Sequence, residues 1–192
     1  MARRASFIKE EQNSQNPLFI LDAGNSLAGT LISLESKGGV IVEGMNAMGY
    51  DALTLGRMEF SLGLETLKEI EESADFDLLS ANVVEKGSQD PIFDPYVILE
   101  RQGITVGTVG LSEADVNADS KIKEQIQVLD PMETAQRYVD ELRDQVDVLI
   151  VLSHLGLDED RALAEKVPGI DIIIGGNTIC RGVCPEVAIR TR

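Results

Sequence analysis

Four short, largely apolar runs, each leading into a turn with a glycine, constrain most strongly how this chain can fold. The runs cover residues 18–21, 51–55, 148–152 and 170–174. Runs of this length that stop at turn residues are typical of buried β-strands, and glycine lets the backbone turn sharply at their ends. Because functional side chains gather at strand ends in α/β folds, the residues that follow these runs are the candidates for a site.

Amphipathic segments alternate with the runs and predict helices between the strands. The predicted helices cover residues 5–12, 39–48, 62–73, 131–142 and 157–167, and a further strand covers 77–82. Pro131 stands at the first helical position, which proline favours. A hairpin is predicted at Gln102-Gly103, between strands 96–100 and 104–111. Together these elements predict a layered α/β fold with a mixed sheet.

The composition predicts one acidic domain over residues 1–192. The formal net charge of −16 at pH 7 argues against a nucleic-acid or anionic-membrane surface, since both need basic patches. No stretch approaches the roughly 20 consecutive apolar residues of a membrane span. Residues 1–10 are partly basic but lead into no apolar segment, so no signal peptide is predicted and the chain as written is expected in the cytoplasm.

The two cysteines stand close together near the end of the sequence. Cys180 and Cys184 form a Cys-x3-Cys pattern, which lacks the two-residue gap of a redox motif or zinc knuckle. A structural or incidental pair is the prediction, with a disulfide only in an oxidising compartment. The spacing leaves open whether they pair.

Seven ordered fragments resemble one family. They are Ala-Arg-Arg-Ala-Ser-Phe-Ile-Lys at 2–9, Leu-Asp-Ala-Gly at 21–24, Gly-Tyr-Asp-Ala-Leu-Thr-Leu-Gly at 49–56, Leu-Ser-Ala-Asn at 79–82, Gly-Ile-Thr-Val-Gly-Thr-Val-Gly-Leu at 103–111, Leu-Ser-His-Leu-Gly at 152–156 and Gly-Ile-Asp-Ile-Ile-Ile-Gly-Gly at 169–176. In this order they resemble the metallophosphatase (calcineurin-like) domain of the 5′-nucleotidase and UDP-sugar hydrolase family.

The resemblance implies a four-layer αββα sandwich with mixed sheets. It also implies that the family's first strand, with its Asp-x-His motif, would precede residue 1, and that the family's C-terminal part and substrate-binding domain would follow residue 192. Family members usually work in the periplasm or outside the cell.

The resemblance further implies a site with two divalent metals (Zn, Mn or Co), bridged by an aspartate and served by a histidine–aspartate pair. Two such cations clamp a phosphate and generate the attacking hydroxide. Carried over by position, the bridging aspartate falls on Asn25, and an asparagine ligand falls on Arg57. The catalytic histidine falls on Met58 and its orienting aspartate on Ser61. The remaining histidine ligands fall on His154, Asn177 and Ile179, of which only His154 is a histidine.

These replacements argue against the family's reaction. One imidazole cannot hold a dinuclear centre, since zinc normally takes three or four protein ligands. The amide oxygens of Asn25 and Asn177 are poor ligands for transition metals, and the cation of Arg57 opposes a divalent ion. We therefore predict no catalytic residue and no cofactor, with His154 as the single candidate metal ligand.

Two functions are predicted from these residues. The first is a non-catalytic relative, retained either to bind phosphate or a nucleotide through Arg57, His154, Asn25 and Asn177, or for assembly with a protein partner or a second copy. The alternative is a divalent-metal-dependent hydrolase of nucleotides or other phosphoesters with a reduced metal site. A shortened gene product is a third reading. Four further acidic residues near the motifs are interpreted as structural, namely Asp22, Asp51, Glu59 and Asp171.

Overall fold

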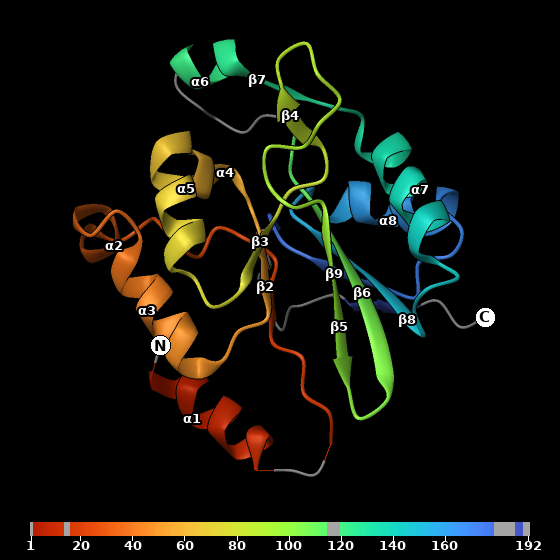
Figure 1. Cartoon of the computed structure of the whole chain (residues 1–192), viewed down its shortest axis with the longest axis horizontal. Helices are drawn as coiled ribbons and strands as arrows, with labels where there is room; N and C mark the ends of the chain where they lie inside the picture. Colours follow the sequence, from red (N-terminus) through yellow and green to blue (C-terminus); the bar gives the residue numbers. More distant parts are fainter. Residues whose placement is uncertain (1, 14–15, 115–119, 179–186, 190–192) are drawn as a thin grey trace.

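The computed structural model describes residues 2–13, 16–114, 120–178 and 187–189. Two β-sheets lie face to face at its centre, and helices cover the outer face of each (Figure 1). The predicted four-layer αββα sandwich is confirmed. No helix among the described residues is long and apolar enough to cross a membrane.

The first sheet has three short parallel strands in the order β1-β2-β3. Its strands are β1 (Leu21–Asp22), β2 (Ala52–Thr54) and β3 (Asp77–Leu79). The helices of this half are α1 (Ala2–Gln12), α2 (Leu31–Glu35), α3 (Gly39–Met48), α4 (Arg57–Phe60) and α5 (Leu64–Ser73). An apolar cluster that includes Met45, Leu53 and Leu67 joins α3, β2 and α5.

The second sheet is mixed and has the order β10-β9-β8-β6-β5. Its strands are β5 (Tyr96–Arg101), β6 (Ile104–Leu111), β8 (Val148–Ser153), β9 (Ile172–Gly175) and β10 (Val187–Ile189). The helices α7 (Pro131–Leu142) and α8 (Leu157–Lys166) pack on it through a second cluster that includes Tyr138, Val151 and Leu163. A separate two-stranded sheet pairs β4 (Val83–Glu85) with β7 (Ile126–Val128), beside α6 (Ser120–Gln125).

Local sequence signals explain the hairpin and the longest helix of the second half. Gln102 and Gly103 both have positive φ, at 53° and 78°, as a two-residue turn of type I′ requires. Asp130 accepts hydrogen bonds from two backbone N–H groups at the start of α7, at 2.9 Å each, and Pro131 follows it. Both predictions are confirmed.

The two sheets approach each other closely, and one glycine makes this contact possible. A Cβ atom placed on Gly110 of β6 would lie 2.5 Å from the Cβ atom of Leu79 of β3. Between the sheets, the buried side chains of Ala52, Leu79 and Leu152 pack against one another. Gly110 therefore lets the two sheets pack closely at this point.

Four predicted strands are shorter in the structure, and at three of them competing hydrogen bonds give a physical reason. Carboxylate side chains and distant carbonyl groups accept hydrogen bonds from backbone N–H groups that would otherwise extend the pairing between strands. The N–H of Ile20 donates to the carboxylate of Asp51 at 2.7 Å, and the N–H of Leu149 donates to Asp171 at 2.8 Å. Beyond β3, Ala81 N donates to the carbonyl of Gly110 in the other sheet at 2.8 Å. The predicted strands 18–21, 77–82 and 170–174 are accordingly observed as 21–22, 77–79 and 172–175, and the predicted strand 51–55 is observed as 52–54.

Candidate functional site

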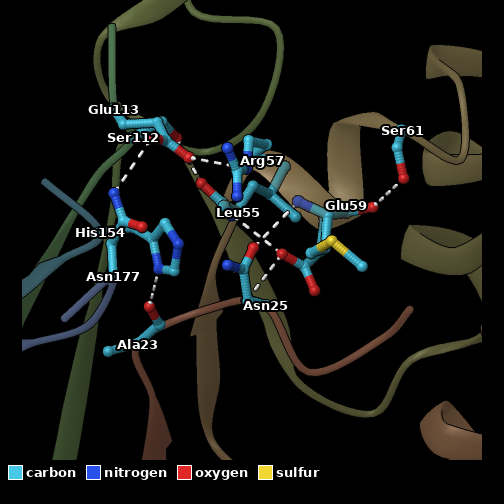
Figure 2. Close-up of polar contacts among 12 residues, drawn as sticks. Ala23, Asn25, Leu55, Arg57, Glu59, Ser61, Ser112, Glu113, His154 and Asn177 are labelled. Carbon is cyan, nitrogen blue, oxygen red and sulfur yellow. Dashed lines mark hydrogen bonds and ion pairs between the residues drawn. The ribbon is translucent and has the colours of Figure 1, made fainter. Parts of the chain in front are cut away.

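Five polar residues that follow strands lie together where the two large sheets meet (Figure 2). Asn25 follows β1, Arg57 follows β2, Glu113 follows β6, His154 follows β8 and Asn177 follows β9. Four of them were predicted from the sequence. Glu113 was missed because the other four came from the family resemblance; like them, it is a polar residue that follows a strand.

His154 is held by the opposite sheet. Only 1% of its surface is exposed, and its Nδ1 lies 2.5 Å from the carbonyl oxygen of Ala23. Because a carbonyl oxygen can only accept, Nδ1 carries the proton and donates it. Nε2 is also buried, and it has no hydrogen-bond partner among the described residues.

Three glycines at strand ends make room for this imidazole. A Cβ atom on Gly56 would lie 2.6 Å from its Cδ2 and 2.7 Å from its Nε2. Cβ atoms on Gly24 and Gly176 would lie 2.9 Å and 2.8 Å from its Nδ1. Real Cβ atoms do not approach other heavy atoms so closely. Glycine in these motifs therefore lets the backbone approach the histidine ring.

Asn25 and Glu59 are tied to the backbone of the first half. Asn25 has φ of 59°, and its Oδ1 accepts the N–H of Met58 at 2.9 Å. The fully buried carboxylate of Glu59 accepts the N–H groups of Asn25, Leu27 and Gly56 at 2.8–3.0 Å. Burial raises the pKa of Glu59, and these three donors oppose the rise. The contacts support the structural interpretation of Glu59.

Arg57 lies beside a carboxylate. Its Nε is 3.9 Å from Oε1 of Glu113, and 47% of the arginine side chain is exposed, against 15% for the glutamate. The other oxygen of Glu113 accepts Nδ2–H of Asn177 at 3.0 Å. Asn177 has φ of 58°, in the left-handed region that asparagine tolerates. Glu113 thus connects the cation of one sheet with the amide of the other.

Ser112 adds a second link between the sheets beside the same cluster. Its hydroxyl donates to the carbonyl of Leu55 at 2.6 Å, and its backbone is paired with the side chain of Asn82 at 2.8 Å. These buried contacts position the neighbouring Glu113. Ser112 directly follows the last residue of β6, and this position after a strand is a signal that could have selected it from the sequence.

A buried acid lies next to His154 on α8. Asp160 accepts a hydrogen bond from the hydroxyl of Ser153. Burial raises the pKa of Asp160 to about 6, while the Ser153 bond and the charge of His154 oppose the rise. No signal in the sequence pointed to Asp160, because this residue stands inside a helix and not at a strand end.

The remaining predicted residues lie outside the cluster or outside the described residues. The hydroxyl of Ser61 donates to the carbonyl of Met58 at 2.6 Å. Asp51 pairs with Arg101, and Asp171 pairs with Arg143, so both acids have the predicted structural role. Asp22 accepts from Ser26 at 2.8 Å and pairs with Arg4 at 3.5 Å. Ile179, Cys180 and Cys184 lie outside the described residues.

The described donor set does not fit the two divalent metals that the resemblance implies. Asn25 uses its carbonyl oxygen on Met58, and the cation of Arg57 stands beside the one carboxylate of the cluster. Over the described parts of the chain, no group of three His, Cys, Asp or Glu side chains could hold a metal ion. The expectation of no cofactor stays a prediction.

Comparisons with known proteins place the chain in a family. A snake venom 5′-nucleotidase from Gloydius brevicauda is 34% identical over 184 residues, which cover 93% of this chain and 31% of the relative. A 5′-nucleotidase precursor of Thermus thermophilus has a TM-score of 0.81 and 33% identity over 90% of this chain and 35% of its own. The calcineurin-like phosphoesterase YfkN of Bacillus subtilis has a TM-score of 0.79 and 30% identity over 91% and 62%. No protein-family model matches the sequence.

Over the residues that it spans, the chain belongs to the 5′-nucleotidase family of calcineurin-like metallophosphatases. It spans about a third of the length of the curated animal 5′-nucleotidases it matches, at 31% and 32% of two of them. The predicted resemblance and fold are confirmed.

Proposed function

We propose that this domain is a non-catalytic member of its family that binds an oxyanion, phosphate or the phosphate of a nucleotide, at Arg57. The observation that carries the proposal is the half-exposed side chain of Arg57 at the junction of the two sheets. Guanidinium groups recognise phosphate through charge-assisted, paired hydrogen bonds. Several relatives are named 5′-nucleotidases, which points to nucleotides as the ligand class.

The contacts around Arg57 support binding over hydrolysis. Arg57 and Glu113 form an ion pair at the centre of the cluster. Met58 and Ser61 stand where the resemblance implies a histidine and its orienting aspartate, so neither can serve as general acid. Asn25 uses Oδ1 on the backbone, which leaves its amino group as a donor toward a ligand oxygen.

Thermal unfolding with inorganic phosphate and with adenosine monophosphate tests the binding. Phosphate at about 100 times its dissociation constant stabilises the folded state by about 2.7 kcal/mol. We expect this shift for the parent and for Lys68→Ala, which removes the same charge on α5, and not for Arg57→Ala. An equal shift in Arg57→Ala, or no shift in the parent, would overturn the anion site.

Phosphate release tests the non-catalytic part. The protein is incubated with adenosine monophosphate and added Mn²⁺, Co²⁺ or Zn²⁺, and we expect release no faster than in a protein-free blank. Release that depends on the added metal and on His154 would support the alternative, a hydrolase with a reduced metal site. The predicted assembly with a protein partner or a second copy stays a prediction, and light scattering checks the latter, since a monomer contradicts it.

A further inference from the structure

Glu113 presents an acceptor that the protein leaves unused. Its Oε1 is buried and has no hydrogen-bond donor among the described residues. Arg57 Nε, at 3.9 Å, is beyond hydrogen-bond distance, and Asn177 bonds only to the other oxygen. A buried acceptor without a donor costs free energy, so this oxygen favours a ligand that brings a donor to it.

We propose that Glu113 is a specificity-determining residue, which makes the Arg57 site select protonated oxyanions such as hydrogen phosphate over fully ionised ones such as sulfate. The inference rests on the proposed oxyanion binding and deepens it. Glu113 was not among the residues that the sequence pointed to, and its role follows from its position beside the arginine.

The selectivity follows from what each anion presents to the carboxylate. An anion bound on the Nε side of Arg57 places an oxygen near Oε1 of Glu113, because these two atoms are 3.9 Å apart. Hydrogen phosphate carries an O–H group and donates it to the carboxylate. Sulfate at neutral pH carries none, so two negatively charged acceptors meet in a poorly solvated place.

A divalent cation would also satisfy the unused oxygen of Glu113, but the cation of Arg57 beside it disfavours a divalent ion. A protonated anion satisfies the arginine and this acceptor together.

Calorimetric titration with inorganic phosphate and with sulfate, at pH 7 and equal ionic strength, tests the proposal. We expect the parent to bind phosphate more tightly than sulfate by about tenfold or more, the cost of one unmet buried acceptor. In Glu113→Gln the amide donates to either anion, so sulfate binding tightens by about tenfold while phosphate binding changes little. Circular dichroism checks that the variant is folded.

The outcomes separate this proposal from the one before it. A parent that binds both anions equally, or a folded Glu113→Gln protein that keeps the parent's preference, overturns the role of Glu113 and leaves oxyanion binding standing. A parent that binds neither anion overturns oxyanion binding itself. Because the ratio in the parent needs no variant, the proposal stays falsifiable even if the substitution prevents folding.

Discussion

Gly56→Ala should destabilise the protein through one steric contact with the candidate site. The backbone of Gly56 has φ of −101° and ψ of −176°, which alanine adopts freely, so no backbone strain is involved. The added Cβ atom would lie 2.6 Å from Cδ2 of His154 and 2.7 Å from Oδ1 of Asn25. Neither side chain can withdraw without losing a hydrogen bond, the first to Ala23 and the second from Met58.

The expected cost follows from overpacking a buried site. One added methyl group in a close-packed interior costs about 1–3 kcal/mol. For a chain of this size, each kcal/mol lowers the melting temperature by about 2–4 °C. We therefore expect thermal unfolding of Gly56→Ala at a temperature about 2–12 °C below the parent's.

The matched control is Gly39→Ala, the same change where space is open. A Cβ atom on Gly39, the first residue of α3, meets no heavy atom within 4 Å. Alanine also favours the helix by about 0.5–1 kcal/mol, so this variant should be as stable as the parent or more stable.

A double substitution tests the named contact. If the imidazole causes the cost, Gly56→Ala should be less harmful in a His154→Ala background than in the parent, since residues in contact couple by about 0.5–3 kcal/mol. The reasoning is refuted if Gly56→Ala leaves the melting temperature unchanged, or if its cost is the same in both backgrounds.

Three further predictions concern buried polar groups, each measured by thermal unfolding against the parent. Thr108→Val should stabilise by about 1 kcal/mol, because the Thr108 hydroxyl is buried without a partner among the described residues; a loss contradicts this. Glu59→Gln should destabilise by about 1–3 kcal/mol, since its amide would face a backbone N–H that the carboxylate now accepts; no loss contradicts it. Asp160 has a pKa raised to about 6 in the folded state, so its ionised form opposes folding, and stability that protonation supplies is lost as pH rises through about 6. Asp160→Asn should therefore gain on the parent as pH rises from about 4 to about 7, and a pH-independent difference would contradict this.

Much of the fold could be predicted because its signals are local. The hairpin at Gln102-Gly103 and the helix that begins at Pro131 depend on backbone angles and caps within a few residues. The predicted helix 62–73 begins two residues later, at Leu64, because Gly63, with φ of 93°, separates α4 from α5. Strand ends were less predictable, since carboxylates from other segments compete for their backbone groups.

The candidate site was predicted in its positions and not in its contacts. Sequence order placed Asn25, Arg57, His154 and Asn177 at strand ends, and the structure brings them together (Figure 2). What each side chain bonds to was not predictable. Glu113 was missed because its importance comes from Arg57 and Asn177, and the latter is 64 residues away.

By itself, the sequence determined the layered α/β fold, the glycine turns and the family to which the chain belongs, because these depend on short-range pattern and order. Only the tertiary structure decided how the polar residues pair. His154 meets the carbonyl of Ala23 across a separation of 131 residues, and Arg57 meets Glu113 from the opposite sheet. The physical reason is that packing two sheets face to face sets which strand ends are neighbours, and that choice assigns each donor its acceptor.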